Sequence, residues 1–271
     1  MNFTEKVITV IKHKQSCVCV GLDTDLDKIP SILKGEKDPL YKFSKEIYDA
    51  TKDYAAAFKP NFAFFECYGP EGMDALSRLA AEMDDDIIKI ADAKRGDIGN
   101  TSSRYNKAVF DFYNFDAVTV NPYMGSDSVL PFLENEEKGV FVLALTSNPG
   151  SKDFQMQKLE NGQFVYEKVI EQINSWNSKR NCGLVVGATH PTMFEGIRNI
   201  APEMPYLIPG IGAQGGDLEN TVKYAFHKKD ILALINSSRG IIYASSGADF
   251  AEVARKKAKE LRDQINELIN Y

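Results

Sequence analysis

Short apolar runs recur along the chain, and segments with a helical pattern of hydrophobic positions separate them. We predict strands at residues 17–23, 55–62, 87–94, 116–122, 140–147, 183–189, 206–212 and 231–238. Each run is short, is apolar over most of its length and is followed by Gly, Pro, Asp, Asn or Ser. This pattern is typical of parallel strands that are covered on both faces.

The segments between the runs carry apolar residues three or four positions apart, which predicts amphipathic helices. The clearest are residues 41–54, 71–83, 164–176 and 250–269. Strand and helix alternate over the whole chain, and eight such units in about 250 residues fit a (β/α)8 TIM barrel. We therefore predict a single α/β domain over residues 1–271 with an N-terminal helix. A doubly wound open sheet is the alternative.

The composition narrows the class of protein. Of 271 residues, 44% are hydrophobic and 26% are charged, as in ordinary globular proteins. The net charge of −6 and the lack of a Lys/Arg block argue against nucleic-acid binding. No run reaches the roughly 18 apolar residues of a membrane span, and the first residues are too polar for a secretion signal. We expect a cytoplasmic protein that binds neither membranes nor nucleic acid.

Cysteine usage agrees with that compartment. Cys17, Cys19, Cys67 and Cys182 form no CxxC pair and join no His/Cys cluster, so the sequence indicates no zinc site. Cysteine has a strong preference for the protein core. We expect all four to be buried free thiols in a reducing compartment.

Charged residues stand at the ends of the first three predicted strands. Side chains two positions apart share one face of a strand, which places Asp23, Lys59, Asp92 and Lys94 at the ends of inward-facing sets. In a barrel these ends meet at the mouth, where the active sites of this fold lie. The array is then either catalytic or a structural ion-pair network that closes the top of the barrel.

Glycine-containing loops follow the seventh and eighth predicted strands, where such barrels usually bind phosphate. Gly210, Gly212 and Gly240 would let backbone N–H groups come close to an anion. Arg239 can hold a phosphate through two hydrogen bonds, and Gln214 can donate another.

Two further features of the sequence bear on a cofactor site and on a lid. Gly210, Gly212 and Gly215 match the dinucleotide pattern G-x-G-x-x-G, but the next strand ends in Asn and Ser rather than in an acid for the ribose. We therefore expect no nicotinamide or flavin. The polar connection 148–163 is long for a compact domain, which is typical of a functional lid.

Together these motifs resemble the orotidine 5′-phosphate decarboxylase family, and its longer bacterial branch in particular. The signature D-x-K-x-x-D-I-x-x-T is intact from Asp92 to Thr101. The resemblance covers essentially the whole chain. Further matches stand in the family's order at Asp23, Lys59 in FKPN, Ser147 in TSNPGS, the segment PGIGAQGGD, and Arg239 with Gly240.

The resemblance implies decarboxylation of orotidine 5′-phosphate to uridine 5′-phosphate and CO2, the last step of de novo UMP biosynthesis, without a metal or other cofactor. It implies a catalytic set of Lys59, Asp92, Lys94 and Asp97. Lys94 would protonate C6 of the pyrimidine as CO2 leaves, with Asp92 beside the substrate carboxylate. Lys59 and Asp23 would complete the charged network and contact the ribose.

The remaining roles also come from the resemblance. Asp97 and Thr101 would reach the active site of the neighbouring subunit, which implies a homodimer with composite sites. The substrate would also be held by Ser147 at the pyrimidine, Pro209 against the ring, and Gln214, Arg239 and the backbone at Gly240 around the phosphate.

This chemistry accounts for the residue types. Loss of CO2 from C6 leaves a carbanion that the ring delocalises poorly, so fixed charge must stabilise it. An ammonium can stabilise the developing anion and then donate a proton, provided that neighbouring acids keep it charged.

Two other functions remain open. A metal-dependent sugar-phosphate decarboxylase or aldolase of the same barrel family would carry an acidic ligand at the end of the second strand, where this chain has Lys59. A non-catalytic sensor of phosphorylated ligands could use the same scaffold, but it would not need both Asp92 and Lys94.

Overall fold

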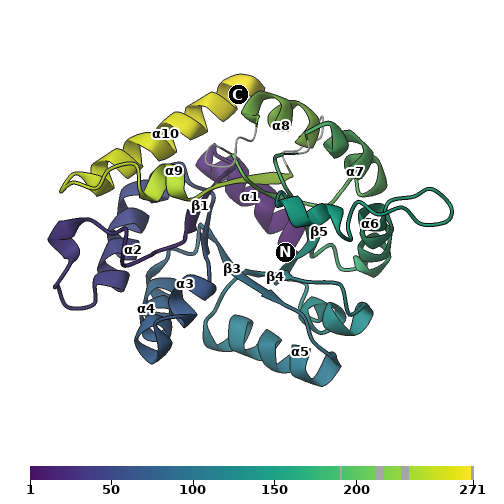
Figure 1. Ribbon diagram of the computed structural model, residues 1–271, viewed down its shortest axis with the longest axis horizontal. Coiled ribbons are helices and arrows are strands. Elements are labelled where there is room, and N and C mark those ends of the chain that lie inside the picture. Colours follow the sequence, from purple (N-terminus) through teal and green to yellow (C-terminus); the bar gives the residue numbers. More distant parts are fainter. Residues whose placement is uncertain (190, 212–216, 227–231, 270–271) are drawn as a thin grey trace.

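A closed barrel of parallel strands forms the centre of the molecule (Figure 1). The computed structural model describes residues 1–189, 191–211, 217–226 and 232–269, and within these ranges eight strands pair in chain order, with β8 closing on β1. The strands are Val18–Leu22 (β1), Ala57–Pro60 (β2), Ile88–Arg95 (β3), Ala117–Val120 (β4), Gly139–Leu145 (β5), Cys182–Val186 (β6), Tyr206–Pro209 (β7) and Ala233–Ser237 (β8). The predicted (β/α)8 barrel is confirmed.

Helices surround the barrel as a ring (Figure 1). They are Phe3–Lys14 (α1), Pro39–Thr51 (α2), Ala63–Glu66 (α3), Gly69–Glu82 (α4), Gly99–Asn106 (α5), Val165–Trp176 (α6), Phe194–Ile200 (α7), Leu218–Ala225 (α8), Arg239–Ile242 (α9) and Phe250–Ile269 (α10). Short helical turns lie at Ser31–Leu33, Lys52–Tyr54, Ser126–Ser128, Leu130–Leu133, Pro149–Lys152 and Pro191–Met193, with a π-helical turn at Lys107–Phe112. The four helices predicted from periodicity correspond to α2, α4, α6 and α10.

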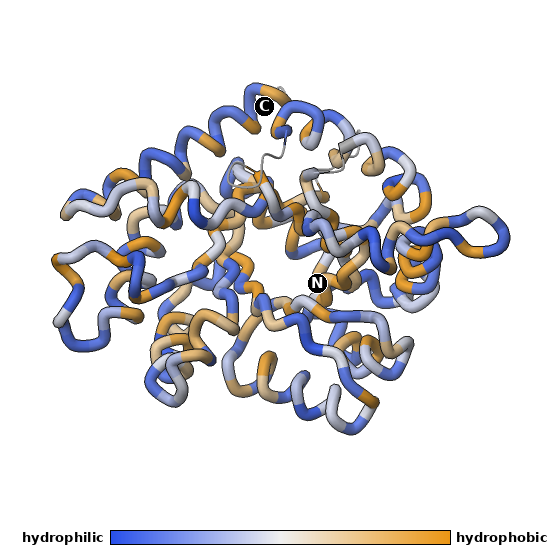
Figure 2. Tube along the Cα trace, in the orientation of Figure 1, coloured by the Kyte–Doolittle hydropathy of each residue, from blue (hydrophilic) through white to orange (hydrophobic). Residues whose placement is uncertain are grey.

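Burial explains the two hydrophobic patterns. Every residue of β1, β2, β4 and β6 is buried, because one face of each strand fills the barrel and the other packs under helices. The outer helices alternate orange and blue along their length in Figure 2, as expected for one apolar face on the barrel and one polar face in water. Among the described residues no helix is long and apolar enough to cross a membrane.

Helix α1 covers the amino-terminal end of the barrel. Asn2 and Glu5 form a capping box at its start, in which each side chain accepts a hydrogen bond from the other's backbone N–H at 3.0 Å. The fully buried ring of Phe3 packs edge-on against Phe141, with 5.7 Å between centroids. A Cβ at Gly139 would lie 2.3 Å from the Phe3 ring, so only glycine fits at the start of β5.

The cysteine prediction is correct for three positions and wrong for one. Cys17, Cys19 and Cys182 are buried, and burial raises the pKa of each thiol to about 12. Cys67 is exposed, because it follows the short α3 where the chain turns outward before α4.

Within 148–163 the chain makes the turn at Pro149–Lys152 and then loops outward beside α6 (Figure 1). A lid function for this loop stays a prediction.

We propose that residues 1–271 form one folding unit that includes α1. Phe3→Ala removes a fully buried ring from the base of the barrel and should lower the free energy of unfolding by about 3–5 kcal/mol. Urea unfolding followed by circular dichroism should show one transition at a lower midpoint. A separate early transition, or an unchanged midpoint, would mean that α1 is not part of the cooperative unit.

Candidate active site

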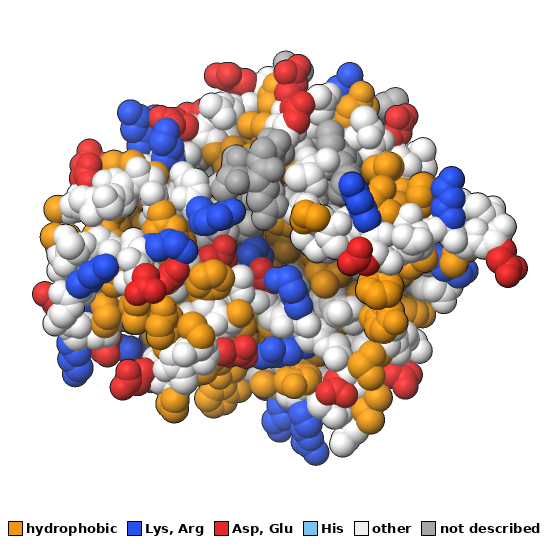
Figure 3. Space-filling model, in the orientation of Figure 1, with side chains coloured by type: hydrophobic (Ala, Val, Ile, Leu, Met, Phe, Trp, Pro, Cys, Tyr) orange, Lys and Arg blue, Asp and Glu red, His pale blue; other side chains and the backbone are white. Residues whose placement is uncertain are grey.

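A cavity of about 440 Å³ opens at the carboxyl ends of the strands. It lies in the hollow near the centre of the face shown in Figure 3, where acidic and basic side chains meet. Each strand, or the loop directly after it, contributes to the lining, from Asp23 after β1 to Asn236 on β8. The cavity therefore occupies the position at which enzymes of this fold carry their active sites.

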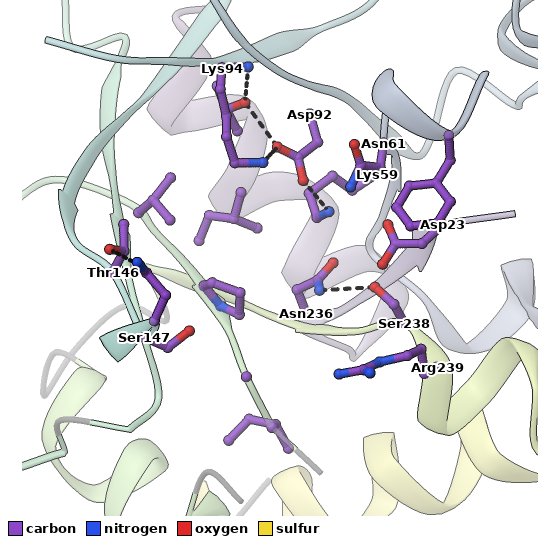
Figure 4. Close-up of a pocket in the computed structure, with 18 of the residues that line it drawn as sticks. Asp23, Lys59, Asn61, Asp92, Lys94, Thr146, Ser147, Asn236, Ser238 and Arg239 are labelled. Carbon is purple, nitrogen blue, oxygen red and sulfur yellow. Dashed lines mark hydrogen bonds and ion pairs between the residues drawn. The ribbon is translucent and has the colours of Figure 1, made fainter. Parts of the chain in front are cut away.

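Three of the predicted residues form a continuous charged array along one wall (Figure 4). The Lys59 ammonium donates to Asp92 Oδ2 at 2.7 Å, and the Lys94 ammonium donates to Asp92 Oδ1 at 2.6 Å. Lys59 and Asp92 are only 4% and 8% exposed, whereas the Lys94 side chain is 51% exposed. Asp92 thus connects a buried cation to one that is accessible from the cavity.

The electrostatics keep the buried pair ionised. Burial opposes the charge of Asp92, but the ammonium groups of Lys59 and Lys94 outweigh it, so the pKa of Asp92 lies well below its ordinary value. Burial likewise disfavours the charged form of Lys59, but Asp92 and Asp23 prevail and its pKa lies above the ordinary value. Both groups are therefore charged at neutral pH.

The backbone at Lys94 departs from a regular strand. Its φ angle is +46°, in the left-handed region, and the pairing of β3 with β4 shifts register between Ala91 and Arg95. A left-handed conformation in a residue with a Cβ is unfavourable by roughly 1–2 kcal/mol. Strain of this kind is typical of functional sites. Alternation of side chains along a regular strand predicts that Asp92 and Lys94 share a face. In the structure they make contact where the strand is distorted by this bulge.

Asp23 presents an unsatisfied oxygen to the cavity. Its Oδ1 atom is buried and has no hydrogen-bond partner among the described residues. The backbone beside it is fixed, because the Tyr243 hydroxyl donates to the Asp23 carbonyl at 2.9 Å and accepts from the Asp25 N–H at 2.7 Å. A buried acceptor without a partner is costly, so this oxygen is suited to a donor supplied by a ligand, such as a sugar hydroxyl.

Other predicted ligand contacts lie around the same cavity. Ser147 and Pro209 line its wall. Arg239, exposed at the start of α9, lies at the opposite end of the site from Lys94 in Figure 4. Gly240 directly follows Arg239 but is not among the residues that line the cavity. Gln214, with Gly212 and Gly215, falls outside the described residues.

The structure does not bring Asp97 or Thr101 into this cavity. Asp97 lies after β3, and its Oδ1 accepts a hydrogen bond from the Ile98 N–H at 2.8 Å. Among the described residues no lysine, arginine or histidine pairs with its carboxylate. Within this chain Asp97 therefore lies apart from the array Lys59–Asp92–Lys94, and its expected role at the site of a neighbouring subunit stays a prediction.

Two residues that the sequence interpretation missed support the site. Thr119 on β4 accepts a hydrogen bond from the Lys94 N–H at 2.9 Å and lies 3.1 Å from Asp92 Oδ1. It is the one polar residue in the strand AVTV, which could have identified it as an inward-facing group. Tyr243 gave no such signal, because it contacts a loop 220 positions away in sequence.

Fold and site together define a (β/α)8-barrel protein with a charged pocket at the carboxyl ends of its strands. Residues 16–256 match the model of the family described as Orotidine 5′-phosphate decarboxylase / HUMPS. The chain belongs to this family.

Named relatives are similar over nearly the whole chain. An orotidine 5′-phosphate decarboxylase of Christiangramia forsetii is 51% identical over 97% of this chain and 97% of its own. One of Flavobacterium johnsoniae is 49% identical over 98% of each chain.

Solved structures agree in fold. The OMP decarboxylase of Leishmania donovani superposes with a TM-score of 0.87 at 38% identity and covers 100% of both chains. The UMP synthase of the same organism gives a TM-score of 0.88 at 39% identity over 99% of this chain, which spans 57% of that longer protein.

The depressed pKa of Asp92 predicts how stability depends on pH. Below the ordinary pKa of 3.8 the unfolded chain takes up a proton at Asp92, whereas the folded protein does not. The contribution of Asp92 is therefore present above about pH 4 and is lost as pH falls through the lower folded value. Wild type should lose up to about 1.4 kcal/mol of unfolding free energy per pH unit more than Asp92→Asn.

Urea unfolding of both proteins between pH 2.5 and 7 in about 0.1 M salt measures this difference. Asp127→Asn, which neutralises an exposed carboxylate on a surface turn, should keep the wild-type dependence. Equal slopes for wild type and Asp92→Asn below pH 4 would contradict the strongly ionised state of Asp92.

Proposed function

We propose that this chain converts orotidine 5′-phosphate to uridine 5′-phosphate and CO2, the reaction for which its close relatives are named. The observation that carries the proposal is the array Lys59–Asp92–Lys94, in which a buried ion pair holds one accessible ammonium at the edge of the cavity. The family membership of the chain supports the same reaction.

In the proposed mechanism the Lys94 ammonium lies at C6 of the pyrimidine. As the bond to the carboxylate breaks, the positive charge stabilises the carbanion that develops at C6. Lys94 then donates its proton to C6, and the product leaves with a C6–H bond. Asp92 holds the ammonium throughout, because its Oδ1 accepts from Lys94 at 2.6 Å.

Asp92 also affects the ground state. A substrate carboxylate about 4 Å from the Asp92 carboxylate is repelled by about 4 kcal/mol at an effective dielectric constant near 20. This repulsion disappears as CO2 departs. It lowers the barrel's affinity for the substrate carboxylate more than its affinity for the transition state.

The other end of the cavity would hold the phosphate of the substrate. Arg239 would bind the phosphate as a cation. Gln214 and the backbone at Gly240 would donate further hydrogen bonds to it. The ribose would lie near Lys59 and the unsatisfied Oδ1 of Asp23. Binding energy from the phosphate, remote from C6, then helps to order the site for the chemical step.

We further propose a homodimer with composite sites. Asp97 and Thr101 lie outside the cavity of their own chain and would enter that of a partner. Large apolar side chains that are 44–82% exposed gather on the loops after β3, β4 and β5, which suits a protein interface. They are Ile98, Tyr123, Met124, Leu130 and Phe154.

The alternatives fit less well. A metal-dependent sugar-phosphate enzyme would place an acidic ligand where β2 carries Lys59, whose ammonium is held by Asp92 at 2.7 Å. A sensor without catalysis has no use for the strained backbone at Lys94.

Free thiols at all four cysteines support a location in the reducing cytoplasm.

The function is tested by following the ultraviolet absorbance of orotidine 5′-phosphate with purified protein and EDTA. Wild type should bleach the orotate chromophore, and Lys94→Ala should reduce kcat by at least about 10³-fold, because proton donor and charge are both lost. Lys168→Ala, on the exposed face of α6, is the matched control and should keep wild-type activity.

No absorbance loss from folded wild type would contradict the proposal. Activity that appears only with Mg²⁺ and a ketose phosphate would favour the metal-dependent alternative.

The composite site predicts complementation between two inactive variants. In a mixed dimer of Lys94→Ala and Asp97→Ala, one site contains both substitutions and the other contains neither. Random exchange of subunits should therefore restore roughly a quarter of wild-type activity, since half of the dimers are mixed and each has one intact site. Verified mixed dimers without activity would contradict the shared site.

A further inference from the structure

The hydroxyl of Thr119 lies between the two residues of β3 that carry the proposed chemistry. The Lys94 N–H lies 2.9 Å from Thr119 Oγ1, and Thr119 Oγ1 lies 3.1 Å from Asp92 Oδ1. A backbone N–H can only donate and an ionised carboxylate can only accept. The hydroxyl must therefore accept from Lys94 and donate its own proton to Asp92.

Thr119 completes the environment of the Asp92 carboxylate. Oδ2 accepts from Lys59 on β2, whereas Oδ1 accepts from Lys94 on β3 and from Thr119 on β4. Three neighbouring strands thus hold one carboxylate. Thr119 is only 1% exposed, and its branched Cβ restricts rotation about χ1, so its hydroxyl is a fixed donor.

Thr119 also accepts a hydrogen bond from a backbone N–H that the bulge leaves without a partner on the next strand. In a regular ladder the Lys94 N–H would find a carbonyl on the next strand, but the register of β3 and β4 shifts between Ala91 and Arg95. The Thr119 side chain supplies the acceptor instead. It thereby satisfies a donor on the one β3 residue with a left-handed backbone.

We propose that Thr119 is a positioning residue for the decarboxylation, an inference that rests on the function proposed above. Its hydroxyl fixes the left-handed turn at Lys94 and the orientation of the Asp92 carboxylate together. The Lys94 ammonium is then directed to one place in the cavity, although its side chain is half exposed.

Thr119→Val tests this role, because it removes the hydroxyl and keeps the branched shape. Two partners then lose a hydrogen bond, one of them charged, and kcat should fall about 10- to 100-fold. KM should change less than about threefold, since the phosphate end is untouched. Thr119→Ser returns the hydroxyl and should recover kcat to within about threefold of wild type.

Thr51→Val is the matched control. Thr51 is also buried and donates to the Ile47 carbonyl at 2.7 Å, but it lies on α2, away from the cavity. It should lower the urea midpoint without changing kcat or KM. The positioning role is overturned if Thr119→Val keeps kcat within threefold of wild type, or if Thr119→Ser fails as Thr119→Val does.

Amide hydrogen exchange at Lys94, measured by NMR, gives a readout that does not depend on activity. The Lys94 N–H should exchange at least about tenfold faster in Thr119→Val than in wild type or Thr119→Ser. If wild type proves inactive on orotidine 5′-phosphate but exchange follows this order, the proposed reaction fails and the geometric role of Thr119 stands. Unchanged exchange in Thr119→Val overturns the role of Thr119 itself.

Discussion

The ion pair between Asp92 and Lys59 is the interaction on which the site depends. Both groups are almost completely buried, and removal of Asp92 leaves the Lys59 ammonium in the barrel without the carboxylate that holds it. The pair persists because donors from three adjacent strands converge on one carboxylate. Because β2, β3 and β4 are parallel neighbours in the barrel, their carboxyl ends lie side by side at one mouth.

The same carboxylate divides two lysines into different roles. Lys59 is enclosed and serves as the fixed counter-ion, whereas Lys94 extends from the opposite oxygen toward the cavity. At the amino-terminal end of the barrel α1 packs through the ring of Phe3 against Phe141, and its Lys6 pairs with the buried Asp116 at 2.6 Å.

The sequence was sufficient for the barrel, because strands such as β1, β4 and β6 are buried on both faces and therefore form apolar runs in the sequence. It also located Asp23, Lys59, Asp92 and Lys94, which end strands that meet at the mouth. Periodicity could not reveal α5, whose polar sequence GNTSSRYN lacks an apolar stripe. Nor could it reveal the direction of Asp97 after the bulge, or the contact of Tyr243 with the loop after β1, since both depend on tertiary geometry.

At Lys94, which has a left-handed backbone, the residue that would be best for stability differs from the residue that the proposed chemistry needs. Glycine adopts this conformation without steric penalty, and it would relax the strand more than any other residue. It would also delete the ammonium to which we assign the proposed protonation of C6. Stabilising this protein by consensus or computation should therefore exempt position 94, because a gain in folding free energy there would remove the proton donor of the proposed reaction.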